Sequence, residues 1–214
     1  MKLLLSLLIA AIVLVADQWL KLWVVDNMVR GQDIHLFGDW FILHYTQNYG
    51  IAFGLEFFGR SGKVFLSLFR MVAVVFIGFF LVQNARQKTT PTGFVIAIAL
   101  IFSGAIGNII DSVFYGVWFD YDTWLHGRVV DMFYLPIINT QLPGWLPIWG
   151  GERFVFFRPV FNIADAAIST GVLMVLLFYR DQFNHFGKAS TKEDKQAPSP
   201  PPGRSSSASF SPPS

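Results

Sequence analysis

Four long apolar stretches constrain the fold of this 214-residue chain more than any other feature of its sequence. An α-helix needs about 20 mostly apolar residues to cross the hydrocarbon core of a bilayer. The stretches cover residues 3–25, 64–82, 93–115 and 163–179. Only 14% of the residues are charged, whereas an ordinary soluble domain has roughly 25%. The pattern predicts an all-α membrane protein with four transmembrane helices.

The first stretch allows a second interpretation. Lys2 followed by Leu3–Val15 also resembles the beginning of a secretory signal peptide. Cleavage after Ala16, however, would put Leu14 at a position where a small residue is needed, and the apolar character continues to Val25. Both observations favour a membrane helix that is retained.

The positions of Lys and Arg predict the orientation, because these residues are enriched in the short cytoplasmic loops of membrane proteins. The link over residues 83–92 contains Arg86 and Lys88 and no acidic residue. The loops 26–62 and 116–162 each contain four acidic residues and at most three basic ones. We therefore expect both termini and the 83–92 link in the cytoplasm, and the two long loops on the outer side.

The long loops and the C-terminal segment differ in composition. Residues 34–45 are rich in aromatic and β-branched side chains, which predicts short strands. Residues 135–161 combine proline with Trp145 and Trp149, which predicts an ordered cap at the membrane interface. The chain thus divides into a membrane domain, residues 1–182, with a small β-rich cap, and a Ser/Pro-rich disordered cytoplasmic tail, residues 183–214.

The composition excludes several classes of site. The chain has no cysteine, which excludes a disulfide framework, a thiolate metal site and a cysteine nucleophile. Its four histidines lack the spacing of metal ligands, and no glycine-rich phosphate loop is present. A net charge of +2 argues against binding to nucleic acid. We therefore expect no metal and no cofactor.

Polar residues inside the apolar stretches are the first candidate functional residues, because an acid at the centre of a span costs about 2.5–3.5 kcal/mol on insertion. Asp17 and Lys21 are four residues apart and share one helix face. Asn108 and Asp111 share a face of the third stretch. For the first stretch, a neutralising ion pair is as good an interpretation as a functional site. For the third stretch, a polar packing seam is likewise as good as a functional site.

Asp131 and Asp165 make a stronger case for function. Asp165 lies at the start of the fourth stretch with Asn162 on the same side, and Asp131 lies in an apolar Val-Val-Asp-Met-Phe segment. Two carboxyl groups that met at the outer membrane surface would share one proton. The ionised carboxylate could then activate a water, and the neutral carboxyl could protonate the leaving amine of a peptide. The two aspartates thus predict metal-free peptide hydrolysis.

The order of the motifs resembles that of bacterial lipoprotein signal peptidase (signal peptidase II), a four-helix membrane aspartyl peptidase. The resemblance covers residues 1 to about 182 and rests on five blocks. These are Asp17-Gln-Trp-Leu-Lys21, Asn48-Tyr-Gly-Ile-Ala-Phe53, Gly104-Ala-Ile-Gly-Asn108-Ile-Ile-Asp111, Val129-Val-Asp131 and Phe161-Asn162-Ile-Ala-Asp165. Each block is weak by itself, but five in the right order are specific.

The resemblance implies an endopeptidase that cleaves a prolipoprotein just before a cysteine carrying diacylglycerol. Its partners would be this lipid-modified precursor and membrane lipid. We expect a monomer in the bacterial cytoplasmic (inner) membrane, with the active site at the extracytoplasmic face. The resemblance implies Asp131 and Asp165 as the catalytic pair. It implies Asn48, Asn108, Asp111 and Asn162 as residues that orient the pair or hold the substrate, and Asp17 and Lys21 as structural neighbours.

This chain departs from the family pattern at two places. The family usually has an arginine, expected to bind substrate carbonyls, directly after the third-helix aspartate, where this chain has Ser112. Arg70, in the second stretch, is our candidate for a substitute donor. The second departure is the long insert over residues 134–160, which we expect to enlarge the outer cap.

Two other functions remain to be weighed against a peptidase. A proton-coupled transporter would place its acids near the bilayer midplane and show paired halves, and no internal repeat is visible here. A membrane scaffold would use the polar seams only for helix packing, and would tolerate Asp131→Asn.

Overall fold

The computed structural model describes residues 1–48, 59–141, 143–145, 151–156 and 159–182. The chain divides into two units, Met1–Phe178 and Tyr179–Ser214. The first unit contains all the helices and strands that are named below. The predicted tail over residues 183–214 lies outside the described residues.

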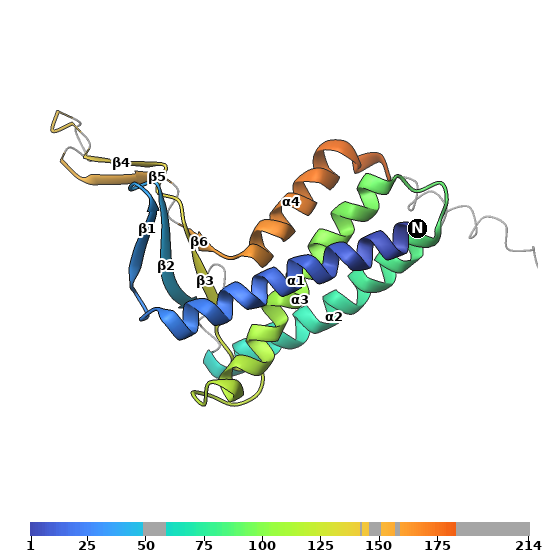
Figure 1. Cartoon of the computed structure of the whole chain (residues 1–214), viewed down its shortest axis with the longest axis horizontal. Helices are drawn as coiled ribbons and strands as arrows, with labels where there is room; N and C mark the ends of the chain where they lie inside the picture. The colour runs from blue at the N-terminus through green and yellow to red at the C-terminus, as the bar shows by residue number, and fades with distance from the viewer. Residues whose placement is uncertain (49–58, 142, 146–150, 157–158, 183–214) are drawn as a thin grey trace, which may run out of the picture. The chain divides into compact units, whose positions relative to one another are not determined.

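Four apolar helices form the larger part of the first unit (Figure 1). They are α1 (Lys2–Asn27), α2 (Gly59–Arg86), α3 (Thr92–Trp118) and α4 (Ile163–Phe178). Within the described part of the chain, α1, α2 and α3 are long and apolar enough to cross a membrane, and α4 is a shorter apolar helix of 16 residues. The predicted set of four helices is therefore confirmed. A full span needs about 20 residues, so α4 is shorter than a full span.

The side chains of these helices are distributed as expected for a protein surrounded by lipid. In α1 the buried residues include Ser6, Asp17 and Lys21, whereas large apolar residues such as Ile12 and Trp19 are exposed. In water this arrangement would leave a large apolar surface uncovered. In a bilayer the apolar surface faces hydrocarbon and the polar residues are kept inside the bundle.

A small antiparallel sheet lies beyond the C-terminal end of α1 (Figure 1). Its strand order is β1 (Asp33–Phe37), β2 (Phe41–Asn48), β3 (Val129–Tyr134) and β6 (Val160–Phe161). The strands predicted in residues 34–45 are thus confirmed. A separate hairpin of β4 (Ile138–Gln141) and β5 (Arg153–Phe156) lies in the 134–160 insert. Its place at the membrane interface stays a prediction.

A buried apolar cluster joins the sheet to the helices. Val24 and Met28 of α1 and Tyr115 of α3 pack with Val130 and Met132 of β3. Because side chains alternate between the two faces of a strand, Asp131 points to the opposite side from its two packed neighbours. The packing of β3 therefore sets the direction of the Asp131 side chain.

Glycines allow α3 and α4 to pack closely together. A Cβ atom on Gly104 would lie 2.3 Å from the Ala164 carbonyl oxygen, and one on Gly171 would lie 2.5 Å from the Ala97 carbonyl oxygen. Real Cβ atoms do not approach backbone oxygens this closely, so no larger residue fits at either place without a shift. This close packing brings the first turn of α4 against the polar face of α3.

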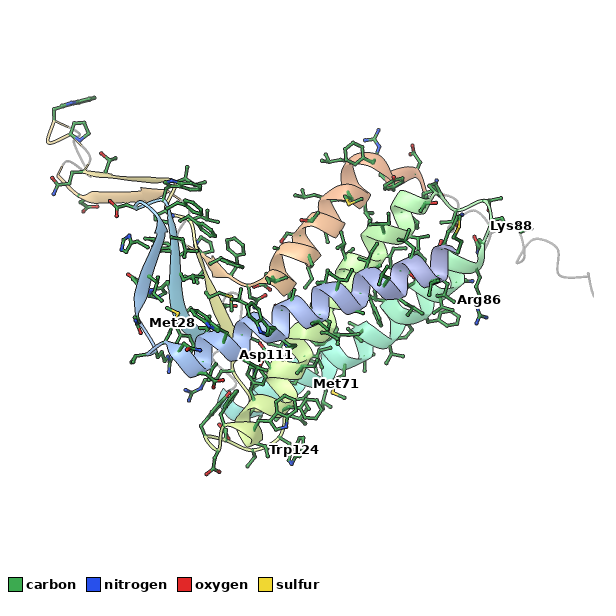
Figure 2. The ribbon with its side chains drawn as sticks, viewed as in Figure 1. Met28, Met71, Arg86, Lys88, Asp111 and Trp124 are labelled. Atoms are coloured by element: carbon green, nitrogen blue, oxygen red, sulfur yellow. The ribbon has the colours of Figure 1, made fainter. Side chains whose placement is uncertain are left out.

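The N-terminus and the link between α2 and α3 lie at the same end of the bundle. Figure 2 places Arg86 and Lys88 at this end and Met28 at the other. The Lys2 ammonium donates hydrogen bonds to the backbone oxygens of Gln87, at 3.2 Å, and Lys88, at 2.9 Å. This agrees with the expectation that the N-terminus and the 83–92 link share one side of the membrane. Which side this is stays a prediction.

Candidate active site

Asp131 is the buried acid of strand β3. Asp131 pairs with Thr46 of β2 in the sheet, and Asp131 is 1% exposed. Asn48 Nδ2 donates a hydrogen bond to Asp131 Oδ2, and Asn162 Nδ2 donates one to Oδ1 at 2.7 Å. Burial raises the pKa of Asp131 to about 7, and the charge of Asp165 contributes in the same direction. This carboxyl group can therefore carry a proton near neutral pH.

Asp165 is held by the cap at the start of α4. The Asp165 backbone N–H donates to Asn162 Oδ1 at 2.8 Å, and the Asn162 backbone N–H donates to Asp165 Oδ2 at 3.4 Å. This reciprocal pattern is a capping box, which satisfies two backbone donors at the start of a helix. Since Asn162 also donates to Asp131, one asparagine links the two acids. The structure thus brings together the two residues that the sequence predicted as a pair.

Asn108 of α3 connects Asp165 to the interior of the bundle. Asn108 Nδ2 donates to Asp165 Oδ1 at 2.8 Å. Asn108 Oδ1 accepts hydrogen bonds from Asn162 Nδ2 and from Lys21 Nζ, both at 3.1 Å. The orientation of the Asn108 amide is therefore determined, because its oxygen faces donors and its nitrogen faces a carboxylate.

A buried ionic cluster lies next to these residues. Lys21 Nζ is 2.8 Å from Asp17 Oδ2 and 2.8 Å from Asp111 Oδ2. All three side chains are at most 1% exposed. Figure 2 shows Asp111 in the interior, toward the end of the bundle that carries the sheet. Asp17 and Lys21 do form an ion pair along one helix face, but Asp111 joins it from another helix.

Two polar side chains in this network were not singled out from the sequence. Gln18 Nε2 donates to Asp111 Oδ1 at 3.0 Å and to Asp17 Oδ2 at 3.1 Å, and the Tyr115 hydroxyl donates to Gln18 Oε1 at 3.1 Å. Tyr115 lies four residues after Asp111, and this spacing was the available signal. Gln18 lies inside the first motif but looks in the sequence like an ordinary neighbour of Asp17.

Arg70 of α2 lies near the acids, as the sequence hypothesis requires. Its guanidinium is affected electrostatically by Asp165, Asp111 and Asp131. Ser112, where the family pattern has arginine, is fully buried, and its hydroxyl has no hydrogen-bond partner among the described residues. Arg70 is thus a cation on a different helix from Ser112, within electrostatic range of these three acids.

The described residues contain no group of three or more His, Cys, Asp or Glu side chains arranged to hold a metal ion. The absence of a metal and of any other cofactor stays a prediction from the sequence.

Comparison with known proteins identifies the family. The family model for signal peptidase (SPase) II matches residues 9–180. The chain belongs to the signal peptidase II family. The lipoprotein signal peptidase of Porphyromonas gingivalis is 47% identical, over 78% of this chain and 79% of the relative. That of Amoebophilus asiaticus is 39% identical, over 79% of this chain and 75% of the relative.

Solved structures also resemble this fold. Two structures of a bacterial membrane enzyme match this fold, one with a TM-score of 0.57 and 26% identity, over 84% of this chain and 90% of that one. The other has a TM-score of 0.53 and 25% identity, over 80% of this chain and 90% of that one. The resemblance inferred from the five motifs is confirmed. As a member of the signal peptidase II family with membrane-spanning helices, the chain is a bacterial membrane peptidase, which argues against the transporter and scaffold interpretations.

Proposed function

We propose that this signal peptidase II removes the signal peptide from diacylglyceryl-modified prolipoproteins by cleaving before the lipidated cysteine, and that Asp131 and Asp165 activate the attacking water. The observation that carries the proposal is the bridge through Asn162. Its side-chain amide donates to Asp131 Oδ1, and its side-chain oxygen accepts the Asp165 backbone N–H. The two acids are therefore held at one place by the residue that caps the start of α4.

The protonation of Asp131 supports an acid–base role. Its pKa of about 7 results from burial first and from the neighbouring Asp165 charge second. A pair of acids that keeps one proton near neutral pH has both a base and an acid available. The two carboxyl groups work as a pair, so we do not assign the water-activating step to one of them.

The proposed reaction needs only the two carboxyl groups and water. The ionised carboxylate takes a proton from the water, and the water oxygen attacks the scissile carbonyl carbon. The neutral carboxyl donates a hydrogen bond to the carbonyl oxygen and stabilises the charge that develops there. When the C–N bond breaks, a carboxyl group gives a proton to the leaving amine of the cysteine. The products are a free carboxylate on the signal peptide and a free amine on the lipoprotein.

The supporting residues hold the acids in place for this reaction. Asn108 Nδ2 donates to Asp165 Oδ1, and Asn48 Nδ2 donates to Asp131 Oδ2. Asn48 is itself exposed, so it is positioned to contact a substrate backbone. Arg70, within electrostatic range of Asp165, Asp111 and Asp131, is proposed to replace the arginine that is missing at Ser112.

The architecture suits a lipid-modified substrate. The exposed faces of α1, α2 and α4 carry large apolar side chains, such as Trp19, Phe76 and Leu176. A substrate with acyl chains can approach such a surface sideways through the bilayer. Asp131 lies on strand β3 and Asp165 in the first turn of α4. Figure 2 shows Arg86 and Lys88 at the end of the bundle away from the sheet. If the basic link lies in the cytoplasm, this arrangement supports a site at the extracytoplasmic face.

The test uses purified Asp131→Asn and Asp165→Asn protein with a synthetic precursor peptide that carries diacylglycerol on its cysteine. We expect each variant to cleave at least a thousandfold more slowly than the wild type, since each loses a proton-transfer group. Asp26→Asn is the matched control, because Asp26 is an exposed acid at the end of α1. Wild-type rates from both site variants would overturn the proposed mechanism. Equal cleavage of the peptide without lipid would overturn the proposed substrate.

A further inference from the structure

Each of the two proposed catalytic acids follows a residue whose backbone N–H is held by a buried carboxylate. The Val130 N–H, next to Asp131, donates to Asp111 Oδ2 at 3.2 Å. The Ala164 N–H, next to Asp165, donates to Asp17 Oδ1 at 2.9 Å. The same contact thus occurs twice, once at strand β3 and once at the first turn of α4.

Lys21 joins these two carboxylates. Its ammonium is 2.8 Å from Asp17 Oδ2 and 2.8 Å from Asp111 Oδ2, and it is 0% exposed. Asp17 and Lys21 lie on α1, whereas Asp111 lies on α3. The connection from Val130 to Ala164 therefore runs through three side chains and needs no contact with solvent.

From this geometry we propose that Asp17, Lys21 and Asp111 form a positioning clamp, which fixes the backbone beside Asp131 and beside Asp165 and so sets the separation of the two acids. The inference rests on the proposed function, because it assumes that this pair is catalytic. None of the three clamp residues contacts substrate, since all are buried. They act through the backbone of Val130 and Ala164.

A neutralising pair that only allows α1 to enter the membrane does not account for these contacts. Such a pair needs one acid and one base, whereas here a second acid from α3 also binds Lys21. Burying charges costs several kcal/mol per ion unless hydrogen bonds complete the pairing. The backbone donors at Val130 and Ala164, together with Gln18 Nε2, complete it.

Positioning of this kind has a large effect on catalysis. A misplacement of about 1 Å in a catalytic group can lower a rate about 100-fold. In lipid the hydrophobic effect does not drive helices together, so close packing and interhelical polar contacts set how these four helices are arranged. An ionic cluster with directional hydrogen bonds can hold β3 and α4 in one register.

Asp17→Asn is the sharpest test of the clamp. Asp17 Oδ1 accepts from Ala164, and Oδ2 faces Lys21 and Gln18. An amide has only one oxygen, so it can satisfy one side but must present its NH₂ group to the other. We expect kcat to fall at least tenfold per folded enzyme in Asp17→Asn and in Lys21→Met. We expect KM to change less than threefold, because neither residue reaches the substrate.

The two substitutions should not act independently. If Asp17 and Lys21 work as one unit, the double variant loses about as much kcat as the worse single variant. Asn84→Leu is the control, because Asn84 is 1% exposed on α2, near the Arg86 end of the bundle. Its folded fraction can fall, but its kcat per folded enzyme should match the wild type.

The inference is overturned if kcat per folded enzyme stays within twofold of the wild type in both single variants. It is equally overturned if the losses of kcat multiply in the double variant. A variant whose KM rises while its kcat stays unchanged would overturn it as well. Should the charged variants not fold, Gln18→Met removes two hydrogen bonds to the clamp without changing any charge. We expect it to lower kcat about fivefold, and wild-type kcat would again refute the clamp.

Asp131→Asn, assayed alongside, separates this failure from that of the proposed function. If Asp131→Asn remains active, the catalytic pair itself is wrong. If it is inactive while the clamp variants keep full kcat, only the clamp is refuted.

Discussion

The protonation of Asp131 predicts an unusual dependence of stability on pH, which Asp131→Asn should remove. In the folded protein its pKa is raised from 3.8 to about 7. The folded state therefore binds a proton at pH 5 that the unfolded chain has released. By linkage, this group stabilises the fold below pH 4 and loses its contribution as pH rises to 7. Above about pH 8 its contribution no longer changes.

The size of the effect follows from the change in pKa. One pKa unit corresponds to about 1.4 kcal/mol, so the whole difference amounts to about 4 kcal/mol. Most of this, about 3 kcal/mol, falls between pH 5 and pH 8. Asparagine does not titrate, so the variant lacks this slope. It has a separate cost, since its NH₂ group must face the amide of Asn48 or Asn162, but that cost does not depend on pH.

The assay is thermal unfolding of purified wild type and Asp131→Asn in detergent at pH 5 and pH 8. From pH 5 to pH 8 the wild type loses this contribution and the variant does not. We therefore expect the Tm of the variant minus that of the wild type to be about 5–10 °C higher at pH 8 than at pH 5. Asp26→Asn, which alters an exposed acid, should show no such rise. A difference between Asp131→Asn and wild type that is the same at both pH values would refute the burial argument. So would a difference that falls as pH rises.

Four further predictions follow from the site and its surroundings. Gly127→Ala should destabilise the fold by about 1–3 kcal/mol in thermal unfolding, because its Cβ would lie 1.9 Å from the Asp111 backbone oxygen; an unchanged Tm would contradict this contact. Arg70→Ala should lower kcat/KM about 10- to 100-fold through loss of a charged donor. Ser112→Arg, added to Arg70→Ala, should restore part of this activity. Full activity of Arg70→Ala with no effect of Ser112→Arg would refute the hypothesis that Arg70 replaces the missing arginine. EDTA should leave cleavage intact, and inhibition reversed by added zinc would disprove a metal-free reaction. Deleting residues 190–214, in the proposed disordered tail, should not alter cleavage, and a collapse in specific activity would show that the tail takes part.

Much of the fold could be predicted because its causes are local in the sequence. A run of about 20 apolar residues has few alternatives to a helix in a bilayer, where every backbone polar group must be satisfied within the segment. The bounds of α1 and α3 accordingly lie within three residues of the predicted ones. Asp131 and Asp165 were also visible, since an acid in an apolar segment is costly and needs a reason.

The partners of these acids could not be predicted in the same way. That Asp111 binds Lys21 depends on how α1 crosses α3. Gly107 leaves room for the Asp17 side chain of α1, but a glycine in the sequence does not say which helix will pack against it. The backbone N–H groups of Val130 and Ala164 have no signature in the sequence, because every residue except proline carries one.

The sequence by itself determined the apolar helices, the polar residues inside them and the family to which they belong, because hydrophobic length and motif order are properties of the linear chain. The tertiary structure decided which donor meets which acid. Asn162 is both the cap of α4 and the partner of Asp131, and only the meeting of β3 with α4 reveals the second role. The raised pKa of Asp131 likewise results from burial and a neighbouring charge, both of which exist only once distant segments have packed together.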